Sequence, residues 1–289
     1  MQRTASLIRT SLRTSSLAPR SQVRNMHIHP VPVRDDNYAY IIQDGSRGVF
    51  VDPFDVPAVQ AAAKKHGVEQ VMGCITTHHH QDHSGGNDDF AKAYPDVPIW
   101  GGSDKCPAMT KQVGDKDAFE LWSGSKIDVK CHATPCHTQD SVAWHLTDAD
   151  GKMGVFTGDT LFVGGCGRFF EGTPQEMHHA LNKVLASLPD KTVLYCGHEY
   201  TKGNIAFGAA ILPERPAVKE LLQFVRERKN GGVTTGAFTI GDEKKHNVFM
   251  LVDDPEVKRA AGLKEDADAV EVMGRLREMK NDGKISAKV

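Results

Sequence analysis

Thr77–Gly86, with the sequence THHHQDHSGG, is the stretch that decides the fold of this 289-residue chain. It follows Val71–Thr77 (VMGCITT), a continuous apolar run that predicts a strand covered on both faces. Its polar side chains follow the spacing HxHxDH and are His78, His80, Asp82 and His83. In an extended loop, alternate side chains point to the same side, so the first two histidines can reach one ion. The Asp-His pair comes after the chain has begun to turn and can face a neighbouring ion. The alternatives are a surface histidine patch or a His-rich tract that binds metals incidentally.

Three further segments place a histidine or an aspartate just after a predicted strand. They are His137 in ATPCHT after Ile127–Ala133, Asp159 in FTGDT after Met153–Thr157, and His198 in YCGHEY after Thr192–Cys196. Parallel and mixed sheets gather such strand ends at one edge, where sites form. Taken singly, each is most often a turn residue. Together the four strand ends supply five imidazoles and two carboxylates, which favours a metal centre.

This set of donors also predicts the kind of metal centre. Five neutral imidazoles and two carboxylates suit borderline divalent ions, zinc first, with iron or manganese as alternatives. Seven donors exceed what one open catalytic zinc uses, because such a site usually has about three protein ligands and a water. They suit two ions bridged by a carboxylate, which convert water into a nucleophile near neutral pH. The sequence therefore predicts a hydrolase with two divalent metal ions per chain.

The remaining pattern divides the chain into an α/β part and a helical part. Further strands are expected at Asn37–Ile42, Gly48–Asp52 and Val142–Thr147, and helices at Val56–His66 and Pro174–Leu188. From about residue 200, strand signals fade, and helices are expected at Pro216–Lys229 and Asp266–Asn281. We predict an α/β sandwich over residues 26–199 and a smaller α-helical domain over residues 200–289.

Residues 1–25 differ from the rest of the chain in composition. They contain five arginines and no acid, and they are rich in Ser, Thr and Leu, a composition typical of a mitochondrial transit peptide. The alternative is a disordered basic tail without an address. Met26 follows directly, so initiation there would leave the protein in the cytoplasm, whereas initiation at Met1 predicts the mitochondrial matrix.

The body after the leader carries 30 basic and 37 acidic side chains, a net charge near −7, which argues against a general nucleic-acid binder. No apolar run approaches the roughly 20 residues that a membrane span needs. The six cysteines show no CxxC pair, which predicts free, mostly buried thiols in a reducing compartment. We expect a monomer.

HxHxDH followed by single His, Asp and His residues resembles the metallo-β-lactamase superfamily and its αββα sandwich. Within it, THHHQDHSGGN, ATPCHT, VFTGDTLFVGGCGRFFEGT and YCGHEYT are similar to glyoxalase II, and the similarity runs from about Met26 to the C-terminus. The resemblance implies a catalytic domain over residues 26–199, a substrate-binding domain over residues 200–289, and catalytic roles for Asp82 and Asp159. The implied ligands are His78, His80 and His137 for one ion, Asp82, His83 and His198 for the other, and Asp159 as the bridge.

The same resemblance implies hydrolysis of S-D-lactoylglutathione to glutathione and D-lactate. The implied glutathione contacts are Arg168, Phe170, Tyr200, Arg277 and Lys280. Arg168 and Phe170 stand where Lys and Tyr are usual, and Gln139 and Asp140 stand where the family usually has a Gly. None of these departures is a ligand position, so they bear on affinity rather than on the reaction. His79, between two implied ligands, should point away from the first ion.

Two other functions share the HxHxDH pattern. A persulfide dioxygenase uses one iron and oxygen, normally has Thr-Asp-Phe after Gly-Cys-Gly-Arg, and lacks a long helical tail. Here Phe169-Phe170-Glu171 follow Arg168, and about 90 residues follow His198. β-lactamases lack the glutathione-type segment and the tail. A non-catalytic metal-binding protein of the same fold is the remaining alternative, but such proteins typically lose ligands, and all seven are present.

Overall fold

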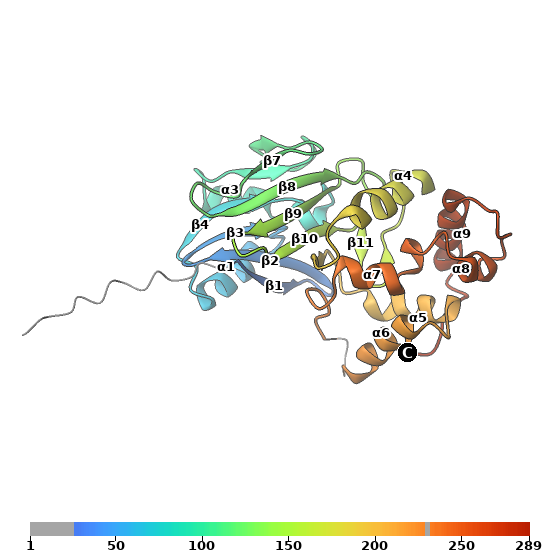
Figure 1. Ribbon diagram of the computed structural model, residues 1–289. Helices are drawn as coiled ribbons and strands as arrows, with labels where there is room; N and C mark the ends of the chain where they lie inside the picture. Colours follow the sequence, from blue (N-terminus) through green and yellow to red (C-terminus); the bar gives the residue numbers. More distant parts are fainter. Residues whose placement is uncertain (1–25, 229–231) are drawn as a thin grey trace, which may run out of the picture.

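Two β-sheets packed face to face form the centre of the computed structural model, which describes residues 26–228 and 232–289 (Figure 1). The six-stranded sheet has the order β1 (His27–Val33), β2 (Asn37–Asp44), β3 (Arg47–Val51), β4 (Gln70–Ile75), β5 (Ile99–Gly101), β6 (Lys111–Gln112). The second sheet has the order β13 (Val193–Cys196), β10 (Met153–Gly158), β9 (Val142–Asp148), β8 (Ile127–Ala133), β7 (Ala118–Glu120). A hairpin of β11 (Leu161–Phe162) and β12 (Gly165–Cys166) lies beside them.

Side-chain alternation explains why the sheets stack. Along β8, Val129 and Cys131 are buried, whereas Lys130 between them is exposed. Strand β2 is buried on both faces, and there Tyr40 packs toward the second sheet and Ile41 packs toward the outer helices. Period-two burial of this kind places one face of each strand between the sheets.

Helices cover both outer faces, so the layers are α, β, β, α. The first sheet is covered by α1 (Val56–Lys65) and α3 (Asn87–Ala93), which share a hydrophobic cluster with β2 and β3. The second sheet is covered by the helical run 174–187, in which Met177 and Leu181 belong to the same buried hydrophobic cluster as Val155 of β10. Thr173 and Glu176 form a capping box at its start. The run is expected as one helix, and it consists of α4 (Pro174–His178), a π-helix (His179–Val184) and a 3-10 turn (Leu185–Ser187).

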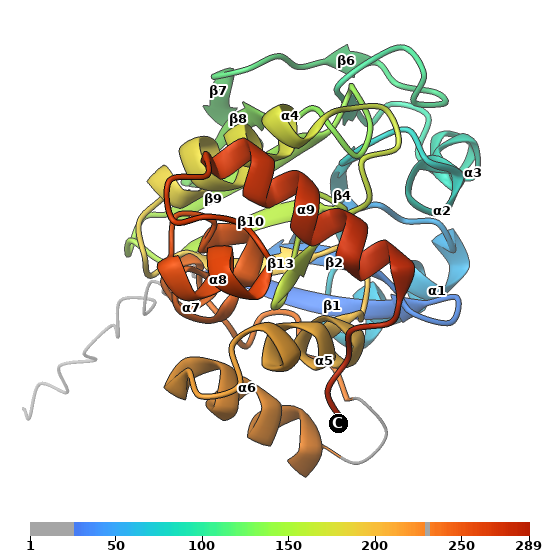
Figure 2. The same ribbon diagram turned by 90° about the vertical axis from the view of Figure 1, so that its right-hand side faces the viewer.

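The chain after β13 is helical. Its elements are α5 (Thr201–Ile211), α6 (Pro216–Glu227), α7 (Ile240–His246), a 3-10 turn (Val248–Met250), α8 (Pro255–Ala260) and α9 (Ala269–Asp282). Figure 2 shows α9 lying across this side of the molecule between α4 and α5. Gly274 permits the close approach to α4, because a Cβ there would lie 3.1 Å from Pro174 Cγ.

Several expectations can be compared directly with these elements. The strands expected around β2, β3, β4, β8, β9, β10 and β13 and the helices expected at α1, α6 and α9 are present, and no end is shifted by more than three residues. All six cysteines are free and buried. No helix in the described ranges is long and apolar enough to cross a membrane. The predicted transit peptide, residues 1–25, and Lys229 lie outside the described residues.

Candidate metal centre and substrate cavity

The residues singled out at strand ends meet at one edge of the two sheets. β10 and β13 run parallel, so Asp159 and His198 leave their strands on the same side. β8 also runs parallel to β10, because β9 pairs with both in the antiparallel sense, and this brings His137 to that edge. His78 and His80 follow β4 of the other sheet. The sequence argument from strand ends is therefore matched by the topology.

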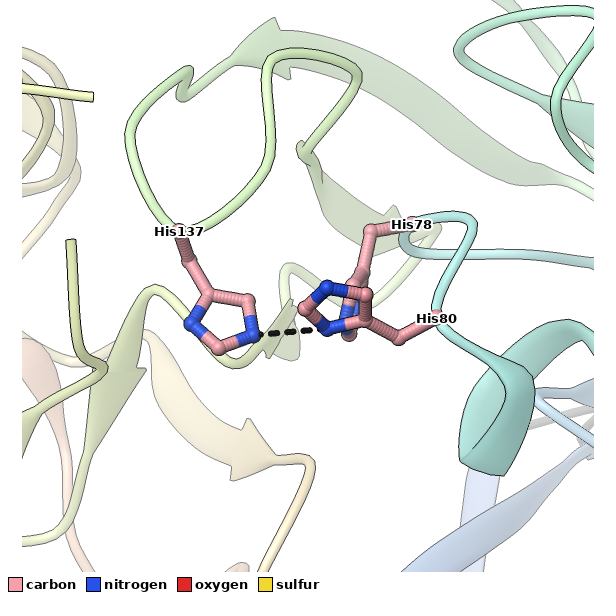
Figure 3. A group of neighbouring side chains, drawn as sticks. All are labelled: His78, His80 and His137. Carbon is pink, nitrogen blue, oxygen red and sulfur yellow. Dashed lines mark hydrogen bonds between the residues drawn. The ribbon is translucent and has the colours of Figure 1, made fainter. Parts of the chain in front are cut away.

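The first group of possible metal ligands consists of three imidazoles, which Figure 3 shows turned toward one another. Nδ1 of His80 lies 3.2 Å from Nε2 of His78 and 3.0 Å from Nε2 of His137. Their ligand atoms all lie within 4.8 Å of one another. Three facing imidazoles with little space between them are arranged as donors to a single cation.

The second group combines a carboxylate with two imidazoles from other elements. Asp82 and His83 lie on the short helix α2 (Gln81–Ser84), and His198 follows β13. Nε2 of His198 lies 3.3 Å from Nε2 of His83 and 3.3 Å from Oδ2 of Asp82. The side-chain amide of Asn37 donates to Asp82 Oδ2 over 3.0 Å and holds that carboxylate in place.

Asp159 lies between the two groups. Its Oδ2 is 3.4 Å from Nε2 of His137 and 3.2 Å from Nε2 of His198, and its Oδ1 is 3.3 Å from Nε2 of His83. Oδ1 is buried without a well-formed hydrogen bond in the described part of the chain, and cations would satisfy it. Gly197 leaves room for this carboxylate, because a Cβ there would lie 2.2 Å from Oδ1.

Four of the five imidazoles are oriented from behind by a hydrogen bond that their Nδ1–H donates. The partners are Thr77 Oγ1 for His78 at 3.1 Å, Asp52 Oδ2 for His83 at 2.9 Å, the Arg168 carbonyl for His137 at 3.0 Å, and Asp36 Oδ1 for His198 at 2.8 Å. Such outer partners set the ring orientation and the tautomer, so that Nε2 faces the site.

Asp36, Asn37 and Asp52 are functional residues that the sequence reasoning missed. Asp52 also accepts hydrogen bonds from the backbone and hydroxyl of Thr77, over 2.8 and 2.6 Å, and its φ of 47° lies in the left-handed region. Strain of this kind persists only where the surroundings hold it. A signal was present, because Asp52 ends a predicted strand in the same way as the other residues of the centre.

The electrostatic field of the site favours positive charge between its carboxylates. Burial alone would raise the pKa of Asp159, but contacts with His83 and His198 hold this pKa well below its usual range. Burial also opposes protonation of His198, but hydrogen bonds with Asp159 and Asp82 raise its pKa to about 10. By contrast, burial lowers the pKa of His78 and keeps that imidazole neutral, the form that binds a metal.

A cavity of about 640 Å³ opens beside this centre and is lined in part by His137 and Asp159. All five residues predicted to contact glutathione also line it: Arg168, Phe170, Tyr200, Arg277 and Lys280. Phe170 and Tyr200 are 61% and 40% exposed, so each keeps a free ring surface. The Tyr200 ring stacks on His198 with 4.7 Å between centroids, and Phe170 lies 5.2 Å from the His137 ring.

The two cations of α9 hold different positions in this cavity. Arg277 is buried, and its Nη1 donates to the carbonyls of Cys166 and Gly167 over 3.2 and 3.4 Å. Lys280 donates from Nζ to the side-chain amide oxygen of Asn204. Burial, followed by the charge of Arg277, lowers the pKa of Lys280 to about 7. Arg277 therefore supports the loop that carries Arg168, a role that the sequence did not indicate.

Comparisons with known proteins agree with this architecture. Residues 33–198 match the family model of the metallo-beta-lactamase superfamily. The fold is similar to the crystal structure of ETHE1 from Myxococcus xanthus, with a TM-score of 0.60, 23% identity, and coverage of 88% of this chain and 90% of that one. A metallo-beta-lactamase from Staphylococcus aureus gives a TM-score of 0.58 at 22% identity over 90% of this chain and 72% of that one. The fold and the site define a member of the metallo-β-lactamase superfamily.

The family within that superfamily follows from closer relatives. Residues 199–283 match the model described as hydroxyacylglutathione hydrolase C-terminus. A probable hydroxyacylglutathione hydrolase of Schizosaccharomyces pombe is 41% identical over 266 residues, 89% of this chain and 99% of the relative. The cytoplasmic hydroxyacylglutathione hydrolase of Arabidopsis thaliana is 39% identical over 260 residues, 89% of this chain and 97% of the relative. The chain belongs to the hydroxyacylglutathione hydrolase, or glyoxalase II, family, and the predicted resemblance and fold are confirmed.

Proposed function

We propose that the protein hydrolyses S-2-hydroxyacylglutathiones, S-D-lactoylglutathione in particular, to glutathione and a 2-hydroxy acid, D-lactate in that case. The observation that carries the proposal is the single cavity that joins Asp159 and His137 of the candidate metal centre to the cations Arg168, Arg277 and Lys280. Glutathione carries two carboxylates and one ammonium group near neutral pH. An acidic protein body can bind such an anion only where cations are gathered locally.

The cofactors in this proposal are two divalent metal ions, with zinc first and iron or manganese as alternatives. One ion would be held by His78, His80 and His137, the other by Asp82, His83 and His198, with Asp159 shared by both. Bound ions of this kind lower the pKa of a water molecule, so that a nucleophile for the thioester carbonyl exists near pH 7. The chemistry of the donor set and the unsatisfied Oδ1 of Asp159 support this assignment.

The side chains of the protein itself bind and orient the substrate. Lys280 and Arg277 are proposed to bind the glycine carboxylate of the glutathione moiety, since they lie three positions apart on α9 and both line the cavity. Phe170 and Phe162 supply apolar wall beside the centre and limit the access of bulk water. Asp82 and Asp159 keep the negative charge that the ions require.

One comparison of activities tests the proposed function. Purified, metal-loaded protein is given S-D-lactoylglutathione, and loss of the thioester absorbance is followed; in a second vessel it is given glutathione persulfide, and oxygen consumption is followed. We expect thioester hydrolysis without oxygen uptake. The opposite pair of results would replace the proposal with an iron-dependent persulfide dioxygenase, and no activity in either vessel would favour a non-catalytic metal-binding protein.

We also propose that residues 1–25 direct the protein to the mitochondrial matrix and that initiation at Met26 supplies a cytoplasmic form. Met26 is buried in the core between the sheets, and its backbone nitrogen lies 3.2 Å from Asp148 Oδ2. In a protein that begins at Met26 this nitrogen would be an ammonium group paired with that carboxylate. A catalytic domain over residues 26–199, a substrate-binding domain over residues 200–289 and a monomeric state complete the proposal, and the last can be measured by light scattering.

A further inference from the structure

His79 points away from the candidate metal centre and toward two carboxylates. Its Nδ1 lies 2.8 Å from Oδ1 of Asp140, and its Nε2 lies 3.6 Å from Oε1 of Glu171. The Asp140 carboxylate is itself nearly inaccessible, with 4% of its side chain exposed. Its other oxygen accepts a hydrogen bond from the Ser103 hydroxyl over 2.9 Å. The imidazole is therefore hydrogen-bonded to Asp140 and lies beside the Glu171 carboxylate, and both carboxylates are fixed by further contacts.

These contacts join three loops that carry proposed functional residues. His79 belongs to the loop of His78 and His80, Asp140 to the loop of His137, and Glu171 to the loop of Arg168 and Phe170. The second and third loops are also tied to each other. The backbone nitrogen of Gln139 donates to Glu171 Oε2 over 2.7 Å, and its side-chain amide donates to the Glu171 carbonyl over 2.9 Å. Through His79, each of the three loops around the first group of imidazoles contacts the other two.

His80 is the imidazole that needs such support. The other four imidazoles of the centre each have a hydrogen-bond partner on Nδ1, whereas Nδ1 of His80 faces His78 and His137. Within residues 26–228 and 232–289, Nε2 of His80 has no hydrogen-bond partner that could orient its ring. Its position depends on its backbone, which Ser84 Oγ holds through the carbonyls of His79 at 2.8 Å and His80 at 3.2 Å.

We propose that His79, braced by Asp140 and Glu171, is a positioning residue that sets the first metal site by fixing the backbone of its neighbour His80. The inference rests on the proposed function for its metal ions but concerns a residue outside the proposed ligand set. Asp140 is part of this arrangement, because one oxygen of its carboxylate contacts His79 Nδ1 over 2.8 Å and the other accepts a hydrogen bond from Ser103. The chain therefore anchors this loop with its own side-chain pair.

Metal affinity tests the proposal independently of turnover. The full chain is stripped of metal and titrated with Co²⁺ against a chelating dye, so that two dissociation constants and the cobalt absorption spectrum are obtained. We expect His79→Ala to raise one of the two Co²⁺ dissociation constants about ten- to hundredfold, the usual effect of losing a residue that supports a metal ligand from behind. The other constant should change by less than about threefold. His79→Asn, whose amide can still donate to Asp140, should recover most of the lost affinity.

Two control variants make the outcome decisive. Asp36→Ala removes the hydrogen-bond partner of His198 Nδ1. It should raise the other dissociation constant, not the one that His79→Ala raises. His179→Ala removes an exposed imidazole from the outer helical run and should change neither constant. The proposal is wrong if His79→Ala leaves both dissociation constants unchanged or raises both equally, or if His79→Asn does not recover the lost affinity. A native protein that binds two ions but does not hydrolyse the thioester would refute the proposed function and leave this comparison of affinities intact.

Discussion

Lys280 on α9 offers the sharpest test of the proposed substrate. Its ammonium lies in the cavity beside the Asn204 amide and has no acidic partner in the described ranges of the chain. A charge-assisted hydrogen bond contributes about 1.5–3 kcal/mol, so Lys280→Met should lower kcat/KM for S-D-lactoylglutathione about ten- to hundredfold. The loss should appear mainly in KM, because the glycine carboxylate is remote from the thioester carbonyl and its charge does not change in the transition state.

The same substitution should stabilise the protein without substrate. Burial, together with the charge of Arg277, lowers the pKa of Lys280 to about 7 from the ordinary 10.5. The unfolded chain therefore binds more protons than the folded one between these two values. The buried ammonium of Lys280 therefore lowers the free energy of unfolding by its full amount below pH 7, and this destabilisation decreases as the pH rises through this window. Methionine removes that cost, so Lys280→Met should melt at a higher temperature at pH 7 while it binds substrate less well.

The assay compares two substrates and two variants. Initial rates are measured for S-D-lactoylglutathione and for a simple thioester without glutathione, with metal content determined in parallel. Lys284→Met, an exposed lysine two residues beyond the end of α9, is the matched control and should behave as the native protein. The reasoning is refuted if Lys280→Met slows both thioesters equally, slows neither, or loses metal.

Four further outcomes are expected. Asp159→Ala should lose both ions in metal analysis, because its carboxylate faces both groups; loss of just one would contradict a bridging role. Arg277→Ala should lower kcat as well as raise KM in steady-state kinetics, since Arg277 also holds the loop at Cys166. KM for the glutathione thioester should rise above about pH 7 as Lys280 loses its proton, with no such rise in Lys280→Met. A protein that begins at Met26 should fold and hydrolyse the thioester at the native rate, and peptide mapping of cytosolic material should find no residues 1–20.

The parts of the fold that sequence could predict are those in which local pattern and tertiary environment agree. The buried strand β4 and the amphipathic helix α6 are such cases, since each follows a pattern that its packing reinforces. β1 is the opposite case. Its sequence HIHPVPV contains two prolines, which argue against a strand, yet it lies at the edge of its sheet, where a missing donor is tolerated. The edge position is a property of the sheet and cannot be read from the segment.

The candidate site divides in the same way. The seven strand-end residues could be predicted, because a strand followed by a turn and a polar side chain is a local pattern, and the topology brings these ends together. The residues behind them could not. Asp36 lies 162 positions from His198, and the Arg168 carbonyl that orients His137 belongs to the backbone and leaves no trace in the sequence. Contacts of this kind exist only once the sheets are packed.

The position of α9 links substrate binding to the metal centre. Arg277 donates to the carbonyls of Cys166 and Gly167, and the next carbonyl, that of Arg168, orients the His137 ring. The helix that lines the cavity proposed for the glutathione moiety therefore also supports a proposed ligand of the first ion. A substrate carboxylate that binds Arg277 would therefore affect the loop beside His137. The effect would pass through the hydrogen bonds from Arg277 to the loop and then through the one between the Arg168 carbonyl and the His137 ring. The helical part of the chain therefore contributes to the metal centre as well as to the cavity, because without α9 this loop would lose the two hydrogen bonds that Arg277 donates to it.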